Sequence, residues 1–204
     1  MRIKQPEIIY EDEAIIVCRK EAGVAVQTAR AGQADVVSLL KNYRAKKKEE
    51  PYIGLIHRLD QPVEGVMVFA KTPQATAKLS AQVSSRSMEK EYLAVTTGVP
   101  EPQKGELRDW LLRDGKTNTS AVVARGTSQA KEAVLDYEVD GFSRTRSRHW
   151  FISGFTPGGI TRFVCSLHMR DIRWWVTQSM ESQSRAVGIV RWRCVPAGSD
   201  FYIL

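Results

Sequence analysis

The stretch Gly54–Thr72 reads GLIHRLDQPVEGVMVFAKT, and it predicts two apolar strands joined by a polar turn. The strands are the runs 54–56 and 66–70, and the turn between them contains a Pro and a Gly, which interrupt strand pairing. Asp60 begins this turn, two positions after Arg58. A carboxylate presented by a rigid sheet suits a nucleophile, and a neighbouring guanidinium favours the charged form of a carboxylate. On spacing alone, an Asp that only caps a turn is the favoured interpretation.

This stretch resembles the signature of the RluA-type pseudouridine synthases, which is written HRLD, then SG, then an apolar run ending FAKT. Two further segments strengthen the resemblance: residues 9–26 resemble the family's opening strand and its K-P-A-G turn, and residues 90–94 resemble its K-x-Y-x-A strand. The likeness covers about residues 7 to 139. The chain departs from the pattern at Glu64, where the family has Ser, and at Glu21, where it has Pro.

The resemblance implies an α+β fold with a mixed, largely antiparallel sheet of the pseudouridine synthase type and flanking helices. It also implies an isomerase that converts uridine to pseudouridine in rRNA or tRNA in the cytoplasm. RNA is then the expected partner, with no DNA, no membrane, no cofactor and no metal. The alternative is a non-catalytic RNA-binding or inactive fragment of the same family.

By the same resemblance, Asp60 is the nucleophile, and it attacks either the uracil ring or the anomeric carbon of the sugar. Arg58 is expected to pair with Asp60 or to hold the RNA once the base leaves its stack. Tyr92 is expected to pack on the uracil and to offer a hydroxyl for proton transfer, although a cross-strand aromatic residue is the alternative. His57 is a weaker candidate for substrate binding, because a lone histidine beside a strand is more often structural.

The composition changes sharply after Asp140. Up to that residue the chain has 21 Lys+Arg and 20 Asp+Glu, whereas residues 141–204 have 9 and 3, out of 30 and 23 in all 204 residues. All nine of these late cations are Arg, and four of the five Trp lie in the same segment. Its apolar residues follow no sustained period, so we predict a C-terminal part that is incomplete or irregular. The expected division is therefore a catalytic portion, 7–139, and an anomalous tail, 140–204.

The genetic code suggests a cause for this change. A codon formed from the third base of one residue's codon and the first two bases of the next is nearly determined by the protein sequence. Between the Phe155/Thr156 and Met180/Glu181 junctions, such codons permit the string HTGRHHQIRVQLAHAGYPLVGDPKYG. This string resembles the family's G-R-x-H-Q-I-R and G-x-P-L-x-G-D-x-x-Y-G motifs. We hypothesise a frame change between about Asp140 and Arg148, which removes an active-site arginine that the family carries in the Q-I-R segment.

Pattern and composition predict the remaining features. We expect a strand over 8–17, a turn at 21–23, helices over about 34–47 and 73–85, and strands over 90–97, 105–112 and 133–139. The lysines at 46–48, with Lys41 and Arg44, either touch RNA phosphates or form a solvated helix end. Three Cys without C-x-x-C spacing agree with a reducing compartment. We expect no signal peptide, no membrane span and no S4-type domain before Ile8.

Overall fold

The computed structural model describes residues 5–30, 32–61, 63–85, 87–96, 101–115, 119–143, 149–155, 190–194 and 202–203. The chain divides into two compact units, of which the first is Met1–Met88 with Ile189–Leu204 and the second is Glu89–Gly188. Each unit is built around its own antiparallel strands.

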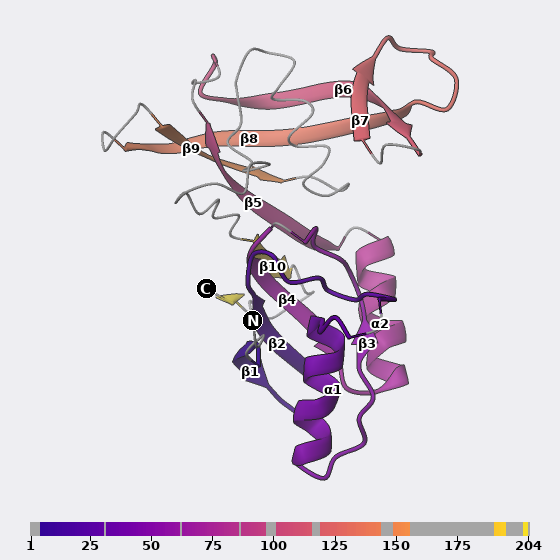
Figure 1. Ribbon diagram of the computed structural model, residues 1–204. Helices are drawn as coiled ribbons and strands as arrows, with labels where there is room; N and C mark the ends of the chain where they lie inside the picture. Colours follow the sequence, from indigo (N-terminus) through magenta and orange to yellow (C-terminus); the bar gives the residue numbers. More distant parts are fainter. Residues whose placement is uncertain are drawn as a thin grey trace. The chain divides into compact units, whose positions relative to one another are not determined.

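The first unit is built on a sheet of four strands in the order β1-β2-β4-β3 (Figure 1). These are β1 (Glu7–Glu11), β2 (Ile15–Lys20), β3 (Gly54–Leu55) and β4 (Gly65–Ala70). All three pairings are antiparallel, and the pairing of β3 with β4 confirms the hairpin predicted around Asp60. Two short strands, β10 (Val190–Cys194) and β11 (Tyr202–Ile203), form an antiparallel pair in the same unit.

The single strand predicted over residues 8–17 is wrong, because β1 and β2 are separate antiparallel strands. The chain turns at Asp12, whose carboxylate Oδ1 accepts hydrogen bonds from the backbone N–H groups of Ala14 and Ile15, each at 2.7 Å. A carboxylate that satisfies two turn amides stabilises a reversal without Gly or Pro. The reversal brings the start of β2 beside the end of β1, with Glu11 opposite Ile16.

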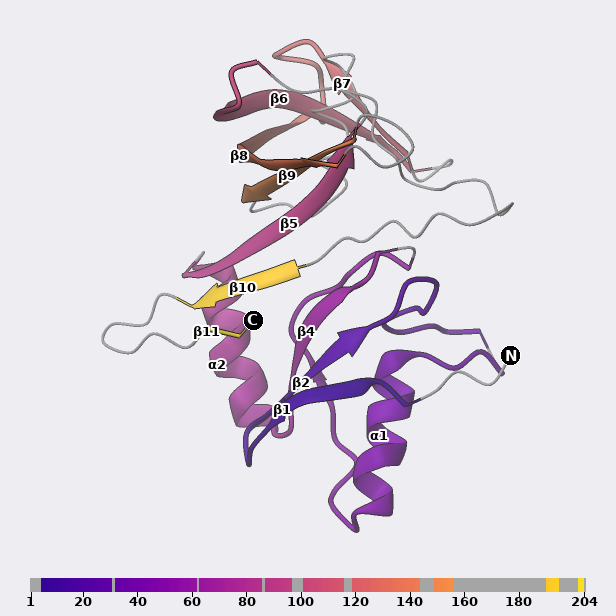
Figure 2. The ribbon, with the colours of Figure 1, turned by 90° about the vertical axis from the view of Figure 1, so that its left-hand side faces the viewer.

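Two helices accompany this sheet (Figure 2); α2 begins at the predicted residue, and α1 begins two residues after the predicted start. Helix α1 (Val36–Lys46) is capped by Asp35, whose carboxylate accepts from the N–H of Ser38. Helix α2 (Pro73–Ser84) is capped by Thr72 and has Pro73 at its first position, where the missing N–H costs nothing. These caps place α1 directly after the loop that follows β2, and α2 directly after β4.

Apolar side chains of β2, β4 and α1 form the core of the first unit. Fully buried members include Ile16, Val17, Met67, Phe69 and Leu40. Cys18 is buried among them, and burial raises the pKa of its thiol to about 12, so it is unreactive at neutral pH. Within the described residues, no helix is long and apolar enough to cross a membrane.

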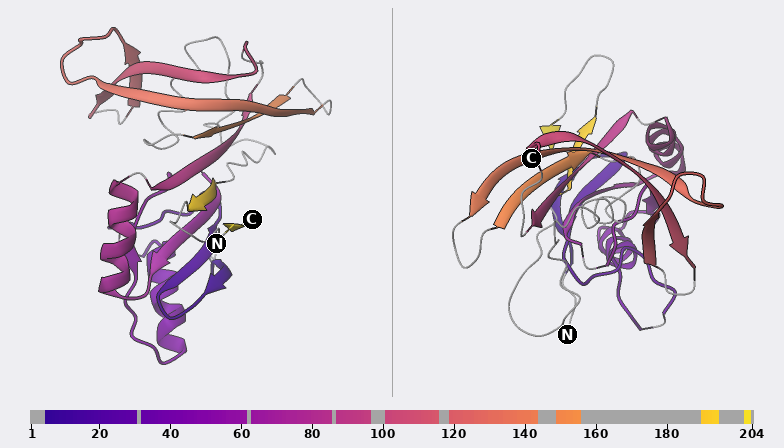
Figure 3. Two further views of the ribbon diagram at one scale, coloured as in Figure 1. Left: turned by 180° about the vertical axis from the view of Figure 1, so that it is seen from behind. Right: turned by 90° about the horizontal axis from the view of Figure 1, so that it is seen from above.

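The second unit contains five antiparallel strands in the order β5-β9-β8-β6-β7 (Figure 3). Their bounds are β5 (Met88–Thr96), β6 (Lys104–Asp114), β7 (Thr119–Val123), β8 (Lys131–Ser143) and β9 (His149–Phe155). The sequence predicts β5, β6 and β8, with β6 and β8 longer than expected. Strands β7 and β9 were not predicted, and β8 runs through the expected boundary at residue 140. The frame change and that boundary stay predictions, and most of residues 156–204 lie outside the described residues.

Candidate active site

Asp60 lies on the turn that follows β3, and its side chain is exposed to a cavity. The turn is closed by a hydrogen bond of 3.0 Å from the backbone N–H of Val63 to the carbonyl oxygen of Asp60. The cavity has a volume of about 250 Å³, close to the smallest ligand pockets of roughly 300 Å³. Asp60 therefore faces a space in which a small polar group fits, and it is neither sealed in the core nor on a flat surface.

The four residues that the sequence predicts for the site lie in different surroundings. Arg58 is exposed and lines the same cavity as Asp60. His57 is 6% exposed and is not among the residues lining that cavity; its Nε2 accepts from the N–H of Val68 at 3.4 Å, which links it to β4. Tyr92 lies in the second unit, on β5 opposite Gly154 of β9, and is 1% exposed. The substrate roles of His57 and Tyr92 stay predictions, and so do their structural alternatives.

Lys20 is the residue that sequence reasoning missed. It is the last residue of β2 and is completely buried. Its Nζ donates to three backbone carbonyl oxygens, those of Glu21 at 3.2 Å, Gln61 at 3.1 Å and Val63 at 2.6 Å. Two of these carbonyls belong to the turn of Asp60, so Lys20 fastens that turn to the end of β2.

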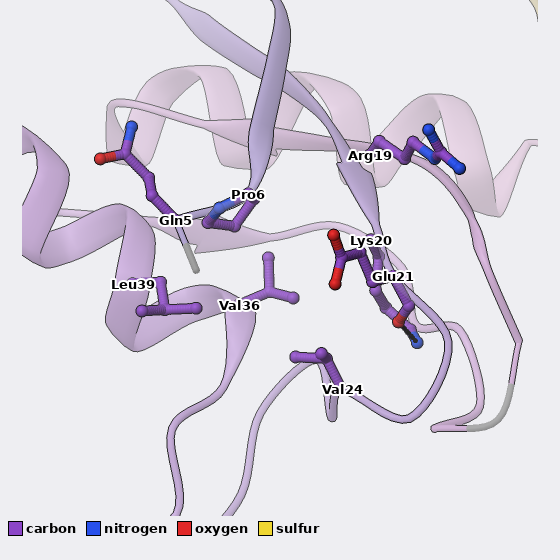
Figure 4. Close-up of a pocket in the computed structure, with 8 residues that line it drawn as sticks. All are labelled: Gln5, Pro6, Arg19, Lys20, Glu21, Val24, Val36 and Leu39. Carbon is purple, nitrogen blue, oxygen red and sulfur yellow. Dashed lines mark hydrogen bonds between the residues drawn. The ribbon is translucent and has the colours of Figure 1, made fainter. Parts of the chain in front are cut away.

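The charge on Lys20 is affected by burial and by the site. Burial lowers the pKa of Lys20 to about 8, while the negative charges of Asp60 and Glu64 oppose that decrease. Figure 4 shows Lys20 and Glu21 across a small cavity from Val36 and Leu39 of α1. That cavity holds about 10 Å³, room for roughly one water molecule, so it is not a second ligand site.

Gly23 and Gln61 also join the turn after β2 to the turn of Asp60, through two hydrogen bonds. The N–H of Gly23 donates to the carbonyl oxygen of Gln61 at 2.8 Å, and Nε2 of Gln61 donates back to the carbonyl oxygen of Gly23 at 2.9 Å. Gly23 has φ of 86°, a left-handed conformation that favours glycine. Hydrogen bonds between Gly23 and Gln61 therefore join the segment 20–26 to the turn that follows the motif at 57–60.

Glu64 and Glu21, the two residues that depart from the family pattern, do not disrupt these hydrogen bonds. Glu64 pairs with Arg19, whose Nε donates to Oε1 of Glu64 at 3.0 Å, on the exposed side of β2. Glu21 is exposed, and its backbone carbonyl is one of the three that Lys20 binds. Neither substitution removes a group that lines the Asp60 cavity.

The opposite wall of the cavity comes from the loop between β2 and α1. Six of its residues line the cavity: Ala25, Val26, Gln27, Thr28, Arg30 and Gln33. The wall is largely polar and brings a second guanidinium, Arg30, to a cavity that already holds Arg58 and Asp60. A cavity with one carboxylate and two guanidiniums suits a ligand that offers an electrophilic carbon to the carboxylate and negative charge to the guanidiniums.

Comparison with known proteins agrees with the sequence motifs. The family model described as RNA pseudouridylate synthase matches residues 14–161. The ribosomal large subunit pseudouridine synthase D of Pseudomonas aeruginosa is 36% identical over 132 residues, which are 64% of this chain and 37% of that protein. The ribosomal large subunit pseudouridine synthase C of Rickettsia bellii is 35% identical over 156 residues, 76% of this chain and 50% of its own. The chain thus spans half or less of the length of these two relatives.

Two solved structures share the fold. Human RNA pseudouridylate synthase domain containing 4 aligns with a TM-score of 0.72 at 19% identity, covering 92% of this chain and 83% of that one. Human RNA pseudouridylate synthase domain containing 1 aligns with a TM-score of 0.75 at 15% identity, covering 97% and 82%. The expected α+β fold with antiparallel sheets and flanking helices is confirmed.

Proposed function

Because the chain belongs to the RNA pseudouridylate synthase family, we propose that its site isomerises uridine to pseudouridine in RNA, with Asp60 as the nucleophile. The observation that supports this proposal most directly is the position of Asp60 in a polar cavity beside Arg58, on a turn that Lys20 and Gly23 fasten to β2. A nucleophile held by its own backbone needs little reorganisation when the substrate arrives.

The reaction requires few protein groups other than such a carboxylate. The carbon–nitrogen bond between base and sugar breaks, the uracil turns, and a carbon–carbon bond forms, with no change of oxidation state. The Asp60 carboxylate adds either to the uracil ring or to the anomeric carbon, and it is released when the new bond has formed. Arg58 is proposed to pair with Asp60 or with the displaced RNA, and Tyr92 to stack on the base and relay a proton.

Ribosomal RNA is the first substrate class to test, since the names of the two bacterial relatives refer to the large ribosomal subunit. Transfer RNA is the second. In either case the uridine must leave its stack to reach a cavity of this size, which favours a loop or another unpaired segment. The cytoplasm, where both RNAs occur, is the proposed location.

We also propose that residues 140–204 are largely an out-of-frame translation, so that this chain lacks the family's third active-site group, the arginine of the Q-I-R segment. The chain then has the nucleophile but not the complete set of charges around it. We expect it to bind RNA with little or no turnover. The nucleotide sequence tests the cause directly: a single-base insertion or deletion near codons 140–148 must restore the motif string.

Tritium release from RNA labelled at carbon 5 of uracil tests the function, because that hydrogen is lost during isomerisation. We expect little release from the present chain and clear release from a frame-restored version. Asp60→Ala in the restored version should abolish release. Asp136→Ala is the matched control, since Asp136 is an exposed carboxylate on β8 that does not line the cavity.

Two outcomes would contradict these proposals separately. Strong Asp60-dependent release by the present chain would show that its tail is functional. Release from the restored chain that survives Asp60→Ala would remove Asp60 from the chemistry.

A further inference from the structure

Two residues of the loop between β2 and α1 are hydrogen-bonded to the start of α1. The backbone N–H groups of Val36 and Val37, at the start of α1, donate to the carbonyl oxygens of Ala25 and Val26 at 3.1 Å each. Residues 25–26 of the loop and the first residues of α1 therefore lie side by side. These two hydrogen bonds tie Ala25 and Val26 to the first turn of α1.

Buried Asp35 fixes the middle of this loop. Its carboxylate, 3% exposed, accepts from the N–H of Ser38 at 2.7 Å as the cap of α1 and from the N–H of Thr28 at 2.8 Å. The hydroxyl of Thr28 in turn accepts from the N–H of Arg30 at 3.1 Å. A chain of hydrogen bonds thus leads from the helix cap to the backbone of Arg30, whose side chain is exposed and lines the Asp60 cavity.

A fixed backbone beneath an exposed guanidinium is an arrangement suited to an anion. RNA offers a phosphodiester on each side of a uridine, and each carries a negative charge that the Asp60 carboxylate repels. Two guanidiniums in the cavity offset that repulsion, and a guanidinium fits two phosphate oxygens at once. Lys20 is unsuited to this role, because it is buried and its Nζ is bound to three carbonyls.

We propose that Arg30 binds a phosphate adjacent to the uridine held at Asp60, with Asp35 as the residue that positions its loop. This inference rests on the proposed function, because it takes the ligand of the cavity to be a uridine within RNA. It adds a contact to the RNA backbone, supplied by a loop that carries none of the motifs singled out in the sequence.

Single neutral phosphates in a short RNA test the contact in the full chain as it stands. The probe is a fluorescent, unpaired RNA with one uridine, in which a methylphosphonate replaces the phosphate on its 5′ or its 3′ side. The adjoining sugar is 2′-O-methylated in every probe, the all-phosphate reference included, so that the backbone stays intact and only the charge differs. Fluorescence anisotropy gives the affinities of the unmutated chain, of Arg30→Ala and of Arg125→Ala, which removes an exposed arginine that does not line the cavity.

One of the two neutral phosphates should weaken binding to the unmutated chain and to Arg125→Ala about tenfold, as expected for one charged hydrogen-bonded contact. The same neutralisation should change the affinity of Arg30→Ala less than about twofold, because the contact is already lost. Arg30→Lys should keep the salt dependence of binding yet lose part of the affinity, since an ammonium does not reproduce the bidentate geometry. Thermal unfolding of the variants shows that they remain folded.

The inference is overturned if neutralisation costs Arg30→Ala as much as it costs the unmutated chain, or if the unmutated chain does not bind the probe. Tritium release by the frame-restored chain is measured in parallel. The restored chain can fail to release tritium while neutralisation still weakens binding to the unmutated chain more than to Arg30→Ala. That result would count against the proposed catalysis and would support Arg30 as an RNA contact.

Discussion

At the scale of single residues, Lys20 explains how the turn of Asp60 is held in a defined position. A buried ammonium is costly to desolvate, and it is retained here with three carbonyl acceptors that no apolar side chain satisfies. Asp60 itself is exposed, and the backbone of its turn is held by the hydrogen bonds of Lys20 and Gly23 to Gln61.

We expect Lys20→Met to lower the free energy of unfolding by about 1–3 kcal/mol at pH 7, because it leaves buried carbonyls without a donor. This decrease in the free energy of unfolding is smaller than the contribution of three hydrogen bonds, because the substitution also removes the cost of burying the charge. Urea denaturation of both proteins measures the difference. Lys41→Met, an exposed lysine on α1, should change stability by less than about 0.5 kcal/mol. Equal effects of the two substitutions would contradict this account.

The stability of the chain should also depend on pH through Lys20. Its pKa is lowered from 10.5 to about 8 in the folded protein, so the unfolded chain binds more protons between these values. Stability from this group therefore rises with pH across that window, by roughly 3 kcal/mol at most. We expect the gap between the unmutated chain and Lys20→Met to widen from pH 8 to pH 10.5. A constant gap would show that the lysine keeps its ordinary pKa, and a narrowing gap would show that its pKa is raised; either result would contradict this account.

At the scale of secondary structure elements, the sequence predicts best where a local signal marks an end. Asp35 lies just before α1, Pro73 opens α2, and Pro62 together with Gly65, the first residue of β4, marks the hairpin; each signal acts within a few residues. The division of β1 from β2 was missed because its turn is made by the carboxylate of Asp12, without the usual turn residues. Strand β7 was missed because it depends on pairing with β6.

In the candidate site, too, the sequence predicts only the residues that a local motif marks. The local motif identified Asp60 and Arg58, and both line the cavity. The other wall and the Lys20 clamp depend on contacts between residues far apart in the chain, such as Lys20 with Val63, which no local pattern indicates. The surroundings of the basic residues at 41–48 were also not predictable from the sequence. Lys47 pairs with Glu11 at 3.1 Å, Arg44 is buried, and Lys41, Lys46 and Lys48 are exposed.

The contact of β3 with α2 gives a prediction at this scale. A Cβ atom on Gly54 would lie 1.9 Å from Oγ1 and 3.0 Å from Cβ of Thr76, so rotation of the threonine alone does not relieve the overlap. Gly54→Ala should therefore destabilise the protein by about 1–3 kcal/mol. Gly115→Ala is the control, since nothing lies within 4 Å of its added Cβ.

The double variant Gly54→Ala/Thr76→Ala should recover part of this loss, because the overlapping hydroxyl is gone. Thr76→Ala alone loses the hydrogen bonds of its Oγ1 to Tyr52 and to the carbonyl oxygen of Thr72. A double variant as unstable as the sum of the two single variants would contradict the overlap, because additivity indicates no contact between the sites.

At the scale of the whole molecule, the charge is unevenly distributed along the chain. The net charge is +7, yet the first 140 residues contribute 21 cations and 20 anions, and residues 141–204 contribute 9 and 3. We therefore expect part of the proposed affinity for RNA to come from the arginines of residues 141–204, which are not among the residues lining the Asp60 cavity. Non-specific attraction of this kind depends on net charge and falls steeply with salt.

Replacing Arg144, Arg146 and Arg148 with Gln lowers the net charge from +7 to +4, and so does replacing Lys41, Lys46 and Lys48. We expect the arginine triple to reduce binding to a uridine-free RNA more, with a salt dependence lower by up to about 2 in the logarithmic slope. The lysines have Glu49 and Glu50 beside them, so their removal uncovers negative charge that already offset them. Anisotropy at several salt concentrations separates the two variants. Equal losses would mean that total charge governs this binding, whereas a larger loss for the lysine triple would assign the contact to α1.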